Sequence, residues 1–491
     1  MFKNIIANYI GKVWGIISVF FFTPFYIKIL GIEAYGVINF YSVILTIMYF
    51  ADAGLSLTLN REMSRNDDKK YLGDMLFTIE RLYLVICLFI FVSITLFSKI
   101  IAENLMNSQT IPTKDLRIYI IIMGLSVAFQ LFTTLENSGL WGLEKQVLSN
   151  GIQVSSGIFR SAIILVPLYF YPSLLTFFIW QALVNITFFL VARYNLWRFV
   201  KSNSIPKFDI NILKSVGRFA GGMMLMAIIS SVSSQIDKLV IVKMLSLKQF
   251  GYYSLAGVLS QVPVIIISPI LLAILPKMVK YSEMKNKENM KKLFHVYSCL
   301  LSSIATSGAL VIFLFTKDFI LIWTHDVNIA NTIEYVTKTL LLGGVFLSFQ
   351  YMPYHLAIAN GHTKTTINFN ILSLILIIPI LFFLVSKFGL IGATFSWLVS
   401  NIIASFYLGY SLINKFLLHE FNKWLFYDTI IPLIITSFIG TISYYITNNL
   451  PKGYYVIIYS VVIGLTSLFT NLFVYSKVLK QCNVKDFINQ N

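Results

Sequence analysis

Long runs of apolar residues fill most of this 491-residue chain and are separated by short polar segments. A helix needs about 20 consecutive apolar residues to cross the hydrocarbon core of a bilayer. Fourteen stretches approach or exceed this length: 8–30, 36–59, 77–98, 116–139, 149–170, 173–192, 219–243, 252–275, 294–315, 333–358, 367–386, 389–412, 428–447 and 454–476. The runs are continuous, whereas a membrane β-barrel alternates apolar and polar residues. The pattern predicts an all-α polytopic membrane protein with about 14 transmembrane helices.

Positive charge concentrates in alternate loops. If both termini are cytoplasmic, the predicted cytoplasmic loops hold 20 Lys and Arg residues and the external loops hold 6. Because cytoplasmic loops retain basic residues, this asymmetry predicts a multi-pass protein of the plasma (inner) membrane with both termini in the cytoplasm. The net charge of +17 then follows from topology and needs no nucleic-acid partner, since the basic residues lie in short loops near membrane lipids.

The loops and motifs argue against an enzyme. The longest connections run to about 25 residues, too short for a catalytic domain outside the membrane. The sequence contains no P-loop, HExxH, CxxC or GxSxG motif. Its three cysteines and five histidines are scattered as isolated residues. We therefore expect a transporter with no metal site and no cofactor.

An internal repeat gives the helices an order. Matching segments recur 215 to 219 residues apart, each at the same place in the helix count: 28–36 and 243–251, 142–145 and 361–364, and Asn185 and Asn401. The repeated unit has six spans, an even number, so both copies share one orientation in the membrane. This predicts two parallel-repeat six-helix lobes, at 1–200 and 201–415. Residues 416–491 would add two transmembrane helices and a cytoplasmic tail.

Arg160 is the most deeply placed charge. It lies about ten residues from either end of its predicted span, or roughly 15 Å at 1.5 Å per residue. A charge at the bilayer centre costs about 2.5–3.5 kcal/mol even on the lenient insertion scale. The planar fork of donors on arginine suits a phosphate or pyrophosphate. An ion pair with Asp52 or Glu136 on a neighbouring helix is the alternative.

Other polar residues within the spans suggest a hydrated cavity. Asp52 and the Asp237–Lys238 pair would either couple transport to protons or sodium or neutralise a cation of the other lobe. Lys12 would meet an anionic headgroup or extend to the interface, and Glu136 is expected to be partly solvated near the cytoplasmic end of its span. Many amides, including Gln130, Gln153, Gln181, Asn185, Gln350 and Asn401, would bind sugar hydroxyls or bond helix to helix.

Several of these segments resemble the Wzx-type polysaccharide flippases, which transport O-antigen and capsule precursors. The segments are Asn8, Pro24, 30–31, 35–36, 52–54 and 60–61 near the N-terminus, and 235–242, 251–256 and 275–276 in the second half. The superfamily also holds MATE multidrug exporters and lipid II flippases. The resemblance implies a V-shaped pair of six-helix lobes, with two extra helices here.

The resemblance also implies a function. Such a protein moves an undecaprenyl-pyrophosphate-linked oligosaccharide from the cytoplasmic to the outer leaflet, and a polysaccharide polymerase and a chain-length regulator would be its partners. On this basis Arg160, Lys238 and Lys12 are candidate substrate-binding residues, and Asp52 and Asp237 are candidate ion-coupling residues. A MATE-like exporter of cationic drugs is one alternative. A membrane-embedded transferase or polymerase is another, although no predicted external loop exceeds about 18 residues.

The charge pattern makes a direct topological prediction. Alkaline phosphatase fused after Lys285 should be inactive, because that loop is predicted to be cytoplasmic, and fused near Thr324 it should be active. Enzyme activity in cells carrying each fusion measures this. The opposite result at either site would contradict the two-lobe arrangement, in which each repeat begins on the same side of the membrane.

Overall fold

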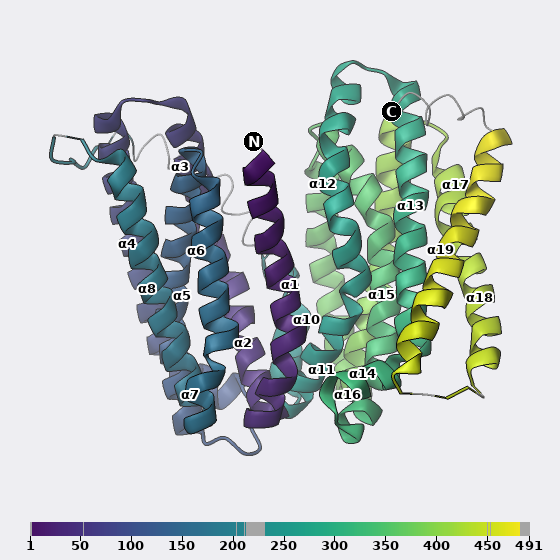
Figure 1. The fold of residues 1–491 in the computed structure, drawn as a ribbon, viewed down its shortest axis with the longest axis horizontal. Coiled ribbons are helices and arrows are strands. Elements are labelled where there is room, and N and C mark those ends of the chain that lie inside the picture. Colours follow the sequence, from purple (N-terminus) through teal and green to yellow (C-terminus); the bar gives the residue numbers. More distant parts are fainter. Residues whose placement is uncertain are drawn as a thin grey trace. The chain divides into compact units, whose positions relative to one another are not determined.

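The computed structural model describes residues 2–481 apart from positions 53, 203, 211, 213–230, 449 and 452, and this part of the chain is helical without strands. Side chains are described between Trp14 and Lys477, Ile16 and the positions just named excepted. The chain divides into two compact units, Met1–Gly251 and Tyr252–Asn491. Figure 1 shows that the long helices within each unit run close to parallel.

The first unit is built around α5, which packs against α8, α4 and α3. Its helices are α1 (Phe2–Leu30), α2 (Ile32–Met48), η1 (Tyr49–Asp52), α3 (Leu55–Arg65), α4 (Lys69–Ile100), η2 (Ile101–Leu105), α5 (Thr113–Gly142), α6 (Gln146–Ile158), η3 (Phe159–Ile163), α7 (Leu165–Phe170), α8 (Leu174–Val200) and α10 (Ile236–Met244). The helix α11 (Leu247–Ser260) begins in this unit and continues into the next. The central place of α5 lets it contribute to every polar site of this unit described below.

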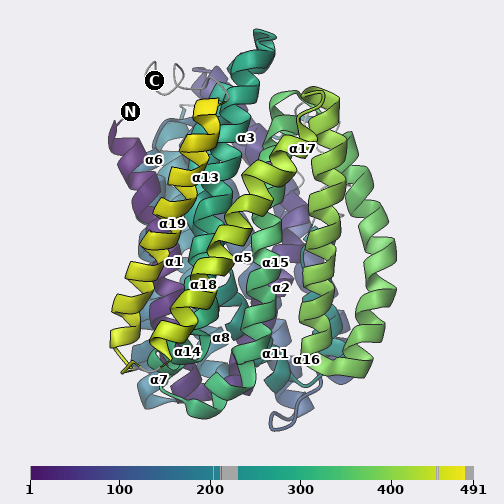
Figure 2. The same cartoon turned by 90° about the vertical axis from the view of Figure 1, so that its right-hand side faces the viewer.

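The second unit is organised around α13, which packs against α12, α15, α18 and α19; Figure 2 shows α18 and α19 in front of it. Its helices are α12 (Val262–Glu283), α13 (Lys287–Leu314), α14 (Thr316–Thr324), α15 (Val327–Ala359), α16 (Lys364–Phe416), α17 (Phe421–Lys423), η4 (Trp424–Ile430), α18 (Ile431–Thr447) and α19 (Tyr455–Gln481). The 53-residue α16 is interrupted at Gly389, whose φ of 58° is left-handed. Glycine adopts this conformation at no steric cost, so two predicted spans follow one another here without a loop.

Length and composition mark the chain as a multi-pass membrane protein. Ten helices in the described residues are long and apolar enough to cross a membrane. Large apolar side chains such as Phe89 and Leu96 on α4 and Phe438 on α18 stay exposed, as expected where lipid replaces water. Residues 219–230 of the predicted span 219–243 lie outside the described residues. The total of 14 spans and the lobe bounds at 200 and 415 remain predictions.

The two copies of the repeated segment 28–36 and 243–251 meet at their glycines. A Cβ atom on Gly36 would overlap the carbonyl oxygen of Leu247, and one on Gly251 would overlap that of Ile32. Small residues let helix backbones approach closely in membranes. The close crossing of α2 and α11 therefore requires glycine at both positions.

The matching asparagines of the repeat also make matching contacts. The Asn185 Nδ2 lies 3.4 Å from the Gln130 Oε1, and the Gln350 Nε2 donates to the Asn401 Oδ1 at 3.2 Å. In each unit, a glutamine two spans earlier thus bonds the repeated asparagine. Some of the amides noted in the sequence therefore bond helix to helix.

The two last helices attach to α13 through side-chain hydrogen bonds. Thr436 of α18 donates to Thr306 of α13 at 3.1 Å, and Asn471 of α19 donates to Thr436 at 3.0 Å. The Oγ atoms of Ser307 and Ser467 lie 2.9 Å apart. These buried hydroxyls therefore find partners in one another rather than facing lipid.

His295 also ties α13 to the C-terminal segment, through partners that lie more than 120 residues away in the sequence. Its Nδ1 lies 2.6 Å from Asp428 and its Nε2 lies 3.2 Å from Glu420. Lys291 and Lys423 pair with Glu420 at 2.8 and 3.1 Å. The hydrogen bond from His295, with those from Lys291 and Lys423, holds the pKa of Glu420 well below its usual range.

The glycine crossing predicts a sharp positional effect. Gly36→Ala and Gly251→Ala should each lower stability by about 1–3 kcal/mol, because a backbone carbonyl cannot move aside for the added methyl group. Thermal unfolding of the detergent-solubilised protein measures this. Gly257→Ala is the matched control in α11, since nothing lies within 4 Å of its Cβ position. Wild-type stability of both crossing variants would contradict this packing.

Candidate functional site

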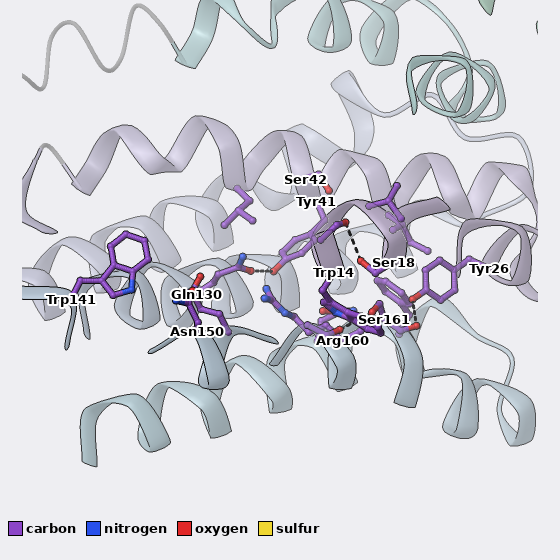
Figure 3. A pocket seen from close by; sticks show the side chains of 18 of the residues that line it. Trp14, Ser18, Tyr26, Tyr41, Ser42, Gln130, Trp141, Asn150, Arg160 and Ser161 are labelled. Carbon is purple, nitrogen blue, oxygen red and sulfur yellow. Dashed lines mark hydrogen bonds between the residues drawn. The ribbon is translucent and has the colours of Figure 1, made fainter. Parts of the chain in front are cut away.

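A cavity of about 750 Å³ opens among the helices of the first unit. One cation, several amides and several aromatic rings line it, and Figure 3 shows its labelled side chains. Those used below are Arg160, the amides of Gln130, Gln146, Asn150, Gln153 and Gln181, and the rings of Trp14, Tyr26, Tyr41 and Trp141. None of the described lining residues is a carboxylate. The cavity therefore presents one positive charge and several amides on a lining that is otherwise mainly apolar.

Arg160 reaches this cavity from a π-helical turn. The turn, η3, lies within the predicted fifth span between α6 and α7. Such turns insert an extra residue into a helix and are frequent at functional sites. The Gln181 Nε2 of α8 donates to the Arg160 carbonyl oxygen at 3.0 Å, which satisfies one backbone acceptor of the irregular turn. Sequence analysis did not predict this turn, because the turn contains neither Pro nor Gly.

The Arg160 side chain is half-buried and forms no ion pair with any carboxylate of the described residues. Its guanidinium acts electrostatically on the hydroxyl of Tyr41, and Figure 3 shows both side chains in the same part of the cavity. The two acidic partners considered from the sequence bond elsewhere. Asp52 accepts hydrogen bonds from Ser56 and Tyr83, and Glu136 contacts Glu80.

A buried network holds one wall of the cavity in place. The Tyr41 hydroxyl donates to the Gln130 Oε1 at 3.0 Å and lies 3.0 Å from the Ser126 Oγ. Asn185, which is 2% exposed, donates to the same Ser126 oxygen at 2.8 Å. Because these side chains restrain one another, Tyr41 and Gln130 present fixed polar atoms to the cavity.

A second contact fixes the first helix to the arginine turn. The Tyr26 hydroxyl of α1 donates to the carbonyl oxygen of Ser161, next to Arg160, at 2.7 Å. Further along α1, the indole of Trp14 packs over Gly157 of α6. Its N–H has no hydrogen-bond partner among the described residues. Trp14 and Trp141 were not singled out in the sequence, although tryptophan inside a span rather than at its end is itself a signal.

The cavity does not bring together all the predicted site residues. Lys238 is half-buried in α10, bonds Gln235 at 3.0 Å and is not among the lining residues. Asp237, in the first turn of α10, and Asp52 are also absent from the lining. Lys12 lies in α1, but its side chain is outside the described residues. Arg160 alone among the five therefore faces this cavity in the part of the chain that the structure describes.

The expectation that Glu136 is partly solvated was wrong. Its side chain is 0% exposed, because helices α4 and α8 cover the end of α5 on which it lies. Counting residues from the end of a span places a side chain along the membrane normal. It does not show which neighbouring helices cover it.

Comparison with known proteins assigns the chain to a family. Residues 1–282 match the family described as "Polysaccharide biosynthesis protein". The chain belongs to this family. The "Putative O-antigen transporter" of Shigella flexneri is 23% identical over 388 residues, which cover 76% of this chain and 88% of that relative. The predicted resemblance to polysaccharide flippases is confirmed, as is the prediction of a transporter rather than an enzyme.

Solved structures share the fold. A lipid II flippase MurJ in an inward closed conformation superposes with a TM-score of 0.75 at 14% identity, covering 98% of this chain and 100% of that one. An inward-facing MATE multidrug transporter of the MOP superfamily gives 0.65 at 14% identity, covering 82% of this chain and 94% of that one. At this identity the likeness concerns the fold alone.

Proposed function

We propose that this protein flips an undecaprenyl-pyrophosphate-linked oligosaccharide from the cytoplasmic to the outer leaflet of the inner membrane. The observation that carries the proposal is the lining of the cavity: an arginine with no acidic partner among the described residues, surrounded by amides and by two tryptophans. The family and the name of the Shigella relative support the substrate class.

Each part of the lining suits one part of such a headgroup. Arginine offers a planar fork of donors that binds phosphate oxygens bidentately. Amides both donate to and accept from sugar hydroxyls. The ring of Trp14 gives an apolar face against which a sugar can pack. The lipid tail would remain in the bilayer while the headgroup occupies the cavity.

The lining disfavours a drug exporter. A cationic drug would require carboxylates or a surplus of negative potential, whereas the described lining residues carry one positive charge and no negative one. The exporter alternative predicts a different phenotype for the deletion strain, so an experiment can distinguish the two functions. Both termini in the cytoplasm and association with a polymerase and a chain-length regulator belong to the proposal.

Arg160 provides the test. In a strain lacking the gene, Arg160→Ala should restore less than about a tenth of the wild-type surface polysaccharide, since losing a charged hydrogen-bond partner costs more than about 1.4 kcal/mol. Arg160→Lys keeps the charge but loses the fork and should restore part of it. Immunoblots of the variants should show wild-type abundance.

The control is Arg117→Ala, which removes an exposed arginine outside the cavity and should restore full polysaccharide. A fall in the abundance of Arg160→Ala would instead indicate a structural arginine. Normal surface polysaccharide with lowered resistance to cationic dyes in the deletion strain would favour the exporter.

A further inference from the structure

A second polar site lies in the first unit, outside the cavity lining. Its centre is Glu136 of α5, which is 0% exposed. Neither of its carboxyl oxygens receives a hydrogen bond from a donor of the described residues. The side chain it contacts is that of Glu80 on α4, another carboxyl group. Two carboxyl groups therefore lie in contact in a buried part of a membrane protein.

Glu80 is fully bonded by donors from α8. The Arg193 Nε lies 3.1 and 3.2 Å from its two oxygens, and the Arg193 Nη2 donates to one of them at 2.9 Å. The Trp197 indole N–H donates to the other at 2.6 Å. Glu80 and Arg193 therefore form an ion pair whose two charges offset each other. Glu136 has no ion-pair partner among the described residues.

The geometry points to a proton. Two ionised carboxylates cannot bond each other, because both are acceptors, whereas a protonated Glu136 can donate to Glu80. An ionised Glu136 would also leave an uncompensated charge in a fully buried site, which is far more costly than holding the acid form. We propose that Glu136 is a proton-binding site and that this proton couples to transport.

Among the described residues, Glu80 of α4 and Arg193 of α8 are the charged groups that act on Glu136. The helix α3 presents the apolar Leu59 to α5 at Gly139. The charged Arg61 and Glu62 of α3 pair with each other. Towards η1, Asp52 is occupied by Ser56 and Tyr83.

A metal ion fits this site poorly. Only two carboxyl groups meet, and one of them is already bound by a guanidinium that would repel a cation. No group of three or more His, Cys, Asp or Glu side chains that could hold a metal occurs in the residues searched, which are those that the structure describes. Sodium and divalent cations prefer several oxygen ligands. The ligand of this site is therefore a proton.

Hydrogen bonds run from the cavity to Asn137, the residue next to Glu136 in α5. Gln153, which lines the cavity, donates to the Ser149 Oγ at 3.2 Å, and Ser149 donates to the Asn137 Oδ1 at 2.8 Å. Asn137 follows Glu136 in α5 and also bonds the Thr133 carbonyl oxygen. A change at the cavity that shifts α6 against α5 would therefore reach Glu136. Arg193, which binds Glu80, has a side chain that is 45% exposed.

Infrared spectroscopy of the protein in lipid vesicles tests the proton directly and does not depend on the proposed function. Wild-type protein at neutral pH should show the C=O stretch of a protonated carboxylic acid, sensitive to deuterium. The band should be lost in Glu136→Gln and kept in Glu283→Gln, which removes an exposed glutamate. Glu80→Gln should also lose it, because Glu136 would then ionise as the partner of Arg193.

Absence of the band, or its survival in Glu136→Gln, would overturn the proposal whether or not the protein flips sugars. The coupling step rests on the proposed function and has its own measurement. With one coupled proton, each pH unit of gradient changes the equilibrium ratio of substrate between the two leaflets about tenfold. Nigericin, which collapses the pH gradient, should therefore lower surface polysaccharide export in wild-type and Glu283→Gln cells.

Glu136→Gln mimics the protonated acid and cannot release it. This variant should accumulate normally and export at a low rate that nigericin does not change. Wild-type export with the same response to nigericin would show that the proton has only a structural role and would overturn the coupling.

Discussion

The free-energy cost of polar and charged groups in a bilayer is the constraint on which the rest of this structure depends. Hydrocarbon offers no hydrogen bonds, so the backbone must satisfy itself as helix, and each polar side chain needs a partner or a hydrated site. Most such groups here have partners on a neighbouring helix. Glu80 bonds Arg193, Asp52 bonds Tyr83, and His295 bonds Asp428.

Arg160 and Glu136 are the two charged residues of the first unit that stand out against this background. Arg160 forms no ion pair with a described carboxylate, yet it lines a cavity with room for polar atoms. Glu136 has no room at all and meets only another acid. The first arrangement suits an anionic substrate, and the second suits a proton. Because α5 contributes to both sites, their states can be linked through one helix.

Sequence reasoning reached the class of protein and several amides of the cavity, because both depend on position along a span. It failed for features that depend on side-chain contacts between neighbouring helices. The burial of Glu136, the bond from Lys238 to Gln235 and the network of His295 depend on neighbours far away in the chain. The crossing at Gly36 and Gly251 was predicted only in part. The internal repeat contains both glycines, but only the structure shows that they lie in contact.

The direct test of the central claim, that the cavity holds the lipid-linked sugar, is photo-crosslinking in cells that make a radiolabelled repeat unit. A photoreactive amino acid at position 153, in the cavity, should yield a sugar-containing adduct, and Arg160→Ala should abolish it. The same probe at position 88, where Leu88 is 59% exposed on α4, should yield none. Equal labelling at the two positions, or no sugar adduct at position 153, would contradict the account.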